Sequence, residues 1–186
     1  IIQNIEIGSR AYSNKSLENI QNYPRLVSNF MSGLHSKSGL DTQLFHEQGS
    51  KGYGFDTFEG LPEDWHNEKA GTYTSEGNIP NVDGGEFIVG KFEDTLPDFF
   101  SEKRPKASII NFDADLYSST ICALNYAKPV IDQHTILIFD EFLMNKNWEQ
   151  DEYKALNEFC RNNNYTYEVL AISFFTKQTA VRLIRC

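Results

Sequence analysis

The chain has 186 residues, of which 40% are hydrophobic and 13% aromatic, and its formal net charge is −9. This length and apolar share suit one globular domain and exclude a disordered chain. The acidic balance, with an isoelectric point near 4.9, argues against a nucleic-acid binder, which would present a basic surface.

The first part of the chain gives the weakest pattern, so the sequence predicts one domain over 1–186 with an irregular or incomplete segment at 1–50. The run NIEIG at 4–8 fits a strand. Apolar residues between Leu17 and Leu34 indicate a helix that is interrupted near Pro24. Residues 59–85 are rich in Gly, Pro, Asn and Glu and predict a long loop, which at this length is typical of a lid or a disordered segment.

From residue 52 onward, short apolar runs alternate with helical patterns, which predicts an α/β fold. Strands are expected at 52–56, 86–90, 107–113 and 135–141, because buried parallel strands are continuous apolar runs. Helices are expected from Ser118 to about Lys128 and around 153–160. The runs 165–174 and 179–185 predict an antiparallel hairpin.

Carboxylates follow four of these strands: Asp56, Glu93 with Asp94, Asp113 with Asp115, and Asp140 with Glu141. Ligands of open α/β sheets bind at the carboxyl ends of the strands. If strands 107–113 and 135–141 are neighbours, their ends lie roughly 5 Å apart. Carboxylates this close raise one another's pKa unless a cation lies among them, and oxygen ligands suit Mg²⁺, with Mn²⁺ or Ca²⁺ as alternatives.

A structural explanation of these acids stays open. A single Asp after a strand is often a turn residue or a helix cap, and Asp115 could cap the helix that begins near Ser118. Paired acids on two adjacent strands favour function, because buried unneutralised charge is costly. Asp56 stands where α/β nucleotide sites place a carboxylate that accepts hydrogen bonds from ribose hydroxyls.

Five blocks carry a family pattern: GFDTFEGLPEDW (54–65), GKFEDTLPDFF (90–100), NFDADLYSST (111–120), LIFDEF (137–142) and YKALNEF (153–159). Together, over about residues 50–186, their order and spacing resemble the macrocin O-methyltransferase (TylF-like) family of class I S-adenosylmethionine-dependent methyltransferases. The resemblance implies a Rossmann-like, mostly parallel seven-stranded sheet with one antiparallel strand and helices on both faces. It also implies Mg²⁺-assisted methyl transfer from S-adenosylmethionine to a hydroxyl of a small molecule, often a sugar of a natural product.

The same resemblance assigns roles to residues. It places Asp113, Asp140 and Glu141 as metal ligands, Asp115 beside Asp113 as the general base, and Asp56 on the ribose. It places the adenine along three further residues, Lys91, Phe92 and Glu93. His66 and His134 are alternative bases, and three aromatic residues are candidates for the acceptor pocket: Trp65, Trp148 and Tyr117.

The glycine-rich turn that should hold the methionine part of the donor departs from the family pattern. The nearest candidate is 5–16, with Glu6 and Gly8 in suggestive places, but Gly8 lies 46 residues before Gly54 and no further glycines follow it closely. A second candidate, 32–39, has glycines but no preceding strand. Three explanations stay open: the turn has diverged, donor binding has been lost, or residues are missing within about 30–55.

The remaining expectations concern setting and partners. Three scattered cysteines, Cys122, Cys160 and Cys186, fit neither a zinc site nor a disulfide framework and favour a cytoplasmic setting. We expect no nucleic-acid or membrane partner, and a homo-oligomer stays open. Two rival functions remain: a metal-dependent glycosyltransferase that uses the Asp113-Ala114-Asp115 motif, and a non-catalytic ligand-binding module that keeps the fold.

Overall fold

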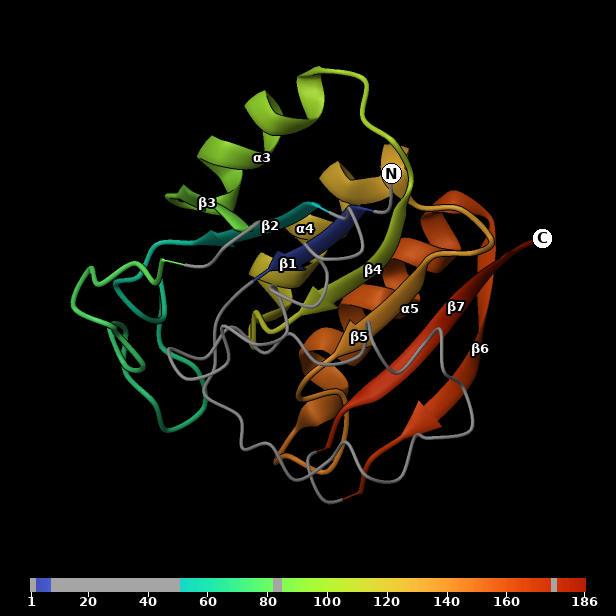
Figure 1. Cartoon of the computed structure of the whole chain (residues 1–186). Helices are drawn as coiled ribbons and strands as arrows, with labels where there is room; N and C mark the ends of the chain where they lie inside the picture. Colours follow the sequence, from blue (N-terminus) through green and yellow to red (C-terminus); the bar gives the residue numbers. More distant parts are fainter. Residues whose placement is uncertain (1–2, 8–50, 82–84, 175–176) are drawn as a thin grey trace.

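The computed structural model describes residues 3–7, 51–81, 85–174 and 177–186 (Figure 1). The expected helix between Leu17 and Leu34 and both candidate glycine turns beyond Ile7 lie outside these residues. Within the described part, the strands are β1 Gln3–Ile7, β2 Lys51–Asp56, β3 Gly85–Val89, β4 Ala107–Phe112, β5 Ile136–Phe139, β6 Tyr165–Ile172 and β7 Thr179–Arg185.

These strands form one sheet in the order β3-β2-β1-β4-β5-β7-β6. Neighbours from β3 to β5 are parallel, whereas β7 is antiparallel to both β5 and β6. The predicted strands, their parallel pairing and the C-terminal hairpin are therefore confirmed. The sheet is α/β and Rossmann-like, with β7 as the antiparallel strand.

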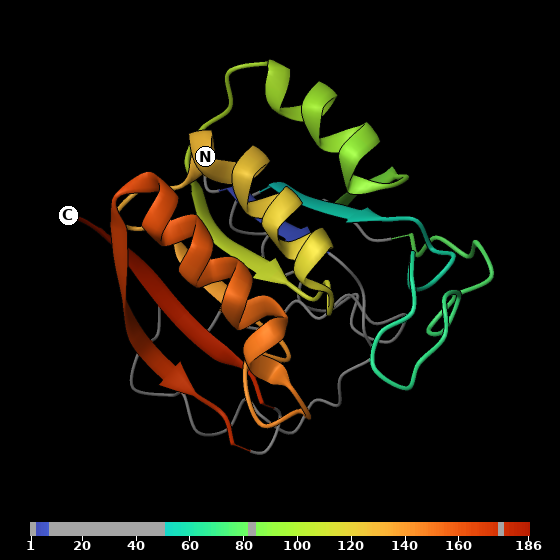
Figure 2. The ribbon, with the colours of Figure 1, turned by 180° about the vertical axis from the view of Figure 1, so that it is seen from behind.

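The described helices α3 Phe92–Ser101, α4 Tyr117–Ala127 and α5 Glu152–Asn163 lie side by side over one face of the sheet (Figure 2). Two short 3₁₀ helices accompany them, Lys128–Val130 and Trp148–Gln150. Helix α4 agrees with the prediction, and α5 ends where Asn164 adopts a left-handed conformation. Helix α3 was not predicted from the sequence, and it contains Pro97, a residue that disfavours helix interiors. None of the helices in the described part is long and apolar enough to cross a membrane.

The core beneath the strand ends is aromatic. Phe112 ends β4 and Phe139 ends β5, the two are paired in register, and their rings stack with centroids 4.9 Å apart. Both side chains are fully buried. This packing fixes which residues emerge together at the carboxyl edge, since a shift of one residue would turn every side chain to the other face.

Residues 57–81 form the long loop expected near 59–85, with only a short bridge between Trp65 and Glu68 as regular structure. Leu61 and Trp65 are buried against Leu116, which precedes α4. Gly60 allows the loop to fold back tightly, because a Cβ there would lie 2.3 Å from the Thr72 carbonyl oxygen. The loop therefore packs on the sheet edge as a defined structure.

We predict that G60A destabilises this loop more than G71A does. The backbone is left-handed at both glycines, with φ at +85° for Gly60 and +84° for Gly71. An alanine in this conformation destabilises the folded state by roughly 1–2 kcal/mol at either position. Only the alanine at position 60 also meets backbone atoms, because nothing lies within 4 Å of a Cβ at position 71. Urea unfolding and proteolysis of the loop measure the difference, and equal effects of the two variants would contradict it.

We also predict that iodoacetamide at pH 8 modifies Cys186 but not Cys160 in the native protein. Burial raises the pKa of the Cys160 thiol to about 11. Cys160 is only 5% exposed, whereas Cys186 is exposed. A raised pKa leaves only about 0.1% thiolate at pH 8, and the thiolate is the reactive form. Peptide mass spectrometry reads the sites. Rapid native modification of Cys160 would show that α5 is not packed as described.

Candidate active site

The carboxyl ends of the parallel strands and the loop 57–81 border a pocket. The described residues that line it come from β2 and its loop, the start of α3, the end of β4 and α4: Asp56, Thr57, Gly60, Leu61, Pro62, Tyr73, Lys91, Phe92, Glu93, Asp113, Ala114, Asp115 and Ser119. The structure thus brings six of the predicted site residues to one cavity: Asp56, Lys91, Phe92, Glu93, Asp113 and Asp115.

The topology explains this convergence. Successive strands lead outward from β1 to β2 and β3 on one side, and from β4 to β5 on the other. Crevices for ligands form where the strand order reverses in this way, outside the carboxyl ends. Glu6 lies on β1 between Gly54 and Asn111 in the ladder, but its side chain is outside the described part, as is the whole of Gly8.

Asp56 ends β2 and lines the pocket beside the start of α3. Its Oδ1 accepts a hydrogen bond of 2.8 Å from the Phe58 N–H, which closes a turn, and its own carbonyl accepts from the Gly90 N–H at 3.0 Å. Asp56 therefore has the turn role that the sequence left open, and the residue also borders the pocket. Lys91 precedes α3, and Glu93 is in its first turn.

Asp113 and Asp140 follow directly on the paired residues Phe112 and Phe139, and Asp140 N–H donates to the Phe112 carbonyl at 3.0 Å. The predicted adjacency of these strand ends is confirmed. All four acids of the two loops are buried: Asp113, Asp115, Asp140 and Glu141. Burial of this much carboxylate in one place is unfavourable unless hydrogen bonds or cations offset it.

Asp115 occupies a tight turn between β4 and α4. Its φ is +57°, and Leu116 N–H donates to the Ala114 carbonyl across it. The residue at the N-cap position of α4 is Leu116, so Asp115 does not occupy the capping position that the structural explanation would give it. A left-handed conformation outside glycine is uncommon and is concentrated at functional sites.

The three predicted metal ligands do not share one cavity. Asp113 lines the first pocket, whereas Glu141 lines a second one. Asp140 Oδ1 accepts a hydrogen bond of 2.6 Å from Gln178 Nε2, and Glu141 Oε2 lies 3.7 Å from Lys177 Nζ. Among the described residues, no three His, Cys, Asp or Glu side chains are arranged to hold a metal ion.

Glu152 is a part of the site that the sequence did not reveal. It begins α5 and is fully buried, and its two carboxylate oxygens accept backbone hydrogen bonds from Ala114 at 3.4 Å and Glu141 at 3.2 Å. Burial raises its pKa well above the ordinary value, and the negative charges of Asp140 and Asp115 raise it further. An acid at a helix start usually complements the helix dipole at the surface, so the sequence carries no signal for this inward orientation.

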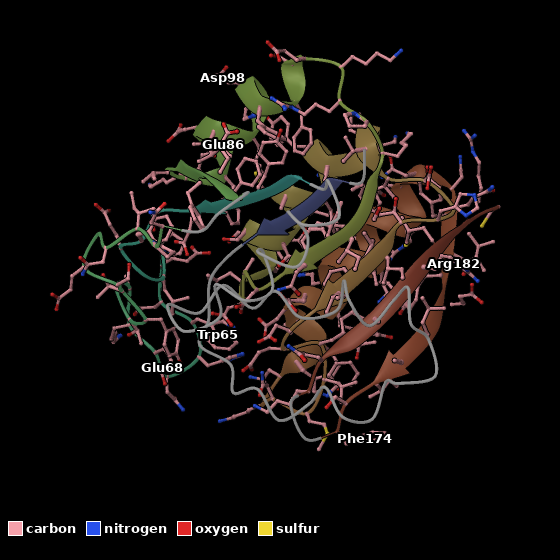
Figure 3. All side chains as sticks on the ribbon, viewed as in Figure 1. Trp65, Glu68, Glu86, Asp98, Phe174 and Arg182 are labelled. Carbon is pink, nitrogen blue, oxygen red and sulfur yellow. The ribbon has the colours of Figure 1, made fainter. Side chains whose placement is uncertain are left out.

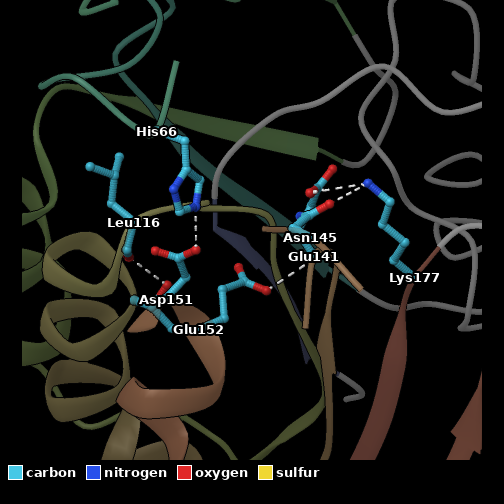
Figure 4. A network of polar contacts seen from close by, with 8 residues as sticks. His66, Leu116, Glu141, Asn145, Asp151, Glu152 and Lys177 are labelled. Atoms are coloured by element: carbon cyan, nitrogen blue, oxygen red, sulfur yellow. Dashed lines mark hydrogen bonds and ion pairs between the residues drawn. The ribbon is translucent and has the colours of Figure 1, made fainter. Parts of the chain in front are cut away.

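The neighbouring Asp151 holds the loop 57–81. Its Oδ2 lies 2.7 Å from His66 Nε2, and Figure 4 shows Asp151 and Glu152 facing different partners from the start of α5. A second hydrogen bond to the loop runs from Ser118 Oγ to Glu63 Oε1, at 2.6 Å. The loop is therefore fastened to both helices that follow the acid-bearing strands.

A second pocket lies beside the first, and Tyr73 lines both. Its other described residues come from the loop, from the segment after β5 and from the turn before β7: Trp65, His66, Asn67, Glu68, Glu141, Asn145, Lys146, Asn147 and Lys177. Trp65 and Glu68 lie together on the loop (Figure 3).

The other aromatic and histidine candidates lie elsewhere. Trp148 packs on Tyr153 with ring centroids 4.8 Å apart, and Tyr117 donates a hydrogen bond to Glu158 at 2.9 Å. His134 is exposed, and its ring lies beside Gln133. None of the three lines the pockets described above, so only Trp65 among the predicted aromatic residues and only His66 among the alternative bases do so.

The sequence matches no protein-family model and no curated protein. Solved structures do resemble the fold. The O-methyltransferase NovP is 17% identical with a TM-score of 0.59, over 77% of this chain and 65% of NovP. CalS11, a calicheamicin methyltransferase, is 18% identical with a TM-score of 0.64, over 98% of this chain and 72% of CalS11.

A third structure is the O-methyltransferase TomG from Streptomyces achromogenes, solved with S-adenosylmethionine. It is 10% identical with a TM-score of 0.51, over 99% of this chain and 73% of TomG. The chain thus spans less than two-thirds of NovP and somewhat more of the other two. At such identities the likeness establishes architecture. The chain has the Rossmann-like fold of class I methyltransferases.

Proposed function

We propose that the protein transfers a methyl group from S-adenosylmethionine to a hydroxyl of a small molecule. The observation that carries this proposal is the pocket at the strand ends, which has Asp56 on one side and the Asp113–Asp115 turn on the other. In this proposal Asp56 would hold the nucleoside of the donor, and Asp115 would act on the hydroxyl oxygen that attacks the methyl carbon. O-methyltransferases that share the fold, one of them solved with the donor, support the same function.

The donor half of the pocket is formed by β2 and the start of α3. Asp56 would accept hydrogen bonds from the ribose hydroxyls, as carboxylates at the end of the second strand do in α/β nucleotide sites. The segment Lys91, Phe92 and Glu93 borders the same cavity and would lie along the adenine. Glu6 of β1 and Gly8, which follows β1 in the sequence, would contact the methionine part.

The acceptor would enter through the second pocket. This pocket is built from the loop 57–81 and the segment after β5, and Tyr73 connects it to the donor side. Its lining of Trp65, asparagines and lysines suits a polar acceptor such as a sugar. CalS11, also described as a TDP-rhamnose 3′-O-methyltransferase, supports a sugar hydroxyl as one acceptor class.

The reaction needs a positioned base. A bond forms between the hydroxyl oxygen and the methyl carbon while the sulfur–methyl bond breaks, which leaves S-adenosylhomocysteine, and the hydroxyl proton must leave. Asp115 borders the pocket on a backbone held in the left-handed region, and it would accept this proton. The loop 57–81, fastened through His66 and Asp151, would hold the acceptor in line and keep water out.

A divalent cation, Mg²⁺ or alternatively Mn²⁺ or Ca²⁺, is a separate part of the proposal. Asp113 and Asp140 fit it, because buried oxygen ligands emerge side by side from β4 and β5. Glu141 does not fit it as arranged, since it faces Lys177 and the second pocket. A bound cation would lower the pKa of the hydroxyl and offset the buried negative charge.

We predict that D56N weakens binding of S-adenosylhomocysteine about tenfold to a hundredfold, because hydrogen bonds to charged groups contribute roughly 1.5–3 kcal/mol. Asparagine keeps the oxygen that closes the turn at Phe58. Isothermal titration calorimetry measures the affinity. The control is D98N, which removes the same charge from an exposed position near the end of α3 (Figure 3).

Two results would contradict donor binding. One is an unchanged affinity of D56N for S-adenosylhomocysteine. The other is a wild-type protein that does not bind S-adenosylmethionine but binds a nucleotide-sugar, as the glycosyltransferase alternative requires. Donor binding without turnover of any acceptor would favour the non-catalytic alternative.

We predict that D115N lowers kcat about 10²- to 10⁴-fold while the affinity for S-adenosylhomocysteine stays the same. Positioned bases contribute this much to proton transfer, and asparagine tolerates the left-handed conformation at this position. The assay is a methyl-transfer screen over sugar and phenol hydroxyls. Retained kcat in D115N would assign the base elsewhere, with His66 as the next candidate.

The same screen tests the cation. If it takes part, EDTA abolishes transfer, added Mg²⁺ restores it, and D140N loses Mg²⁺ binding in calorimetry. Full activity in the presence of EDTA would contradict the role of the metal, but it would not contradict methyl transfer itself.

A further inference from the structure

We propose that Glu152 is a positioning residue that sets the spacing between the two acid-bearing loops after β4 and β5. The proposal rests on the proposed methyl transfer, because it concerns the alignment of Asp115 and its neighbours. Glu152 itself lines neither of the pockets described above, so it would act through the loops that it holds.

The contacts are made to backbone atoms of both loops. Oε1 accepts from the N–H of Ala114, which lies between Asp113 and Asp115, and Oε2 accepts from the N–H of Glu141. One side chain therefore spans two loops that belong to different strands. Because both partners are main-chain groups, the bonds fix where these loops lie.

Among the common side chains, only a carboxyl group offers two oxygens that can both accept in this fork, and acceptor capacity remains when the group is protonated. Glutamine has the same shape but presents one oxygen and one NH₂ group, so one of the two N–H groups would face a donor. A buried N–H without an acceptor is costly, and the loop that carries it would move to find one. E152Q is therefore a selective test, since it changes hydrogen bonding with almost no change of volume.

The placement of this acid is otherwise unfavourable. The residue is 0% exposed, and the charges of Asp140 and Asp115 act on it. A carboxylate at the first position of a helix could equally have remained in solvent. Residues that break a folding rule in this way are expected at functional sites, where alignment outweighs stability.

The matched control is E158Q. Glu158 lies on the same helix, and its Oε2 accepts a hydrogen bond from the Tyr117 hydroxyl of α4 at 2.9 Å. This substitution also changes a glutamate that links α5 to another element, but it leaves the strand-end loops untouched. Resistance of Cys160 to iodoacetamide reports whether α5 stays packed in either variant, because Cys160 is buried on that helix.

The experiment combines hydrogen exchange with kinetics. In E152Q we expect faster amide exchange at Ala114 and Glu141 by NMR, and a kcat about 10- to 100-fold lower, because small displacements of reacting groups have effects of this size. The affinity for S-adenosylhomocysteine should change less than about threefold, since Asp56 and α3 are unaffected. E158Q should leave exchange at both amides and kcat unchanged.

Unchanged exchange and unchanged kcat in E152Q would overturn the proposal. Loss of Cys160 protection in E152Q, or an equal loss of kcat in E158Q, would overturn it as well, by showing that general packing is responsible. If the wild type methylates no acceptor, the proposed function fails. In that case, amide exchange at Ala114 and Glu141 still shows whether Glu152 holds the two loops.

Discussion

The burial of carboxylates at one edge of a parallel sheet is the constraint on which the rest of the site depends. The stacked rings of Phe112 and Phe139 place Asp113 and Asp140 next to each other, and both residues are buried. Negative charge in such a place must be offset. The structure offsets part of it with Gln178 at Asp140 and with the ammonium group of Lys177 near Glu141.

Helix α5 connects this charged edge to the loop above it. Its first residue, Glu152, binds the backbone of both strand-end loops, and the residue before it, Asp151, binds His66 of the loop 57–81. The first pocket, the second pocket and the acids therefore share one anchoring point. The proposed methyl transfer would need such an arrangement, because acceptor and donor must align within a fraction of an ångström while water is excluded.

Much of the architecture could be predicted, because the signals were local. Continuous apolar runs marked β4 and β5, and the two final runs marked the hairpin of β6 and β7. The acids that follow the strands identified Asp56, Asp113 and Asp115 as residues of one pocket, since parallel strands deliver their carboxyl ends to a common edge. Helix α3 was not predicted, and Pro97 within it disfavours a helix that packing nevertheless stabilises.

Local sequence patterns specify the alternation of elements and the acidic residues at the ends of β2, β4 and β5. The pairing of those acids, by contrast, depends on the folded chain. The tertiary structure turned Glu141 toward Lys177 and away from Asp113, and it drew Glu152 inward between two loops. The physical reason is that side-chain direction and burial depend on partners distant in sequence, which no local pattern records.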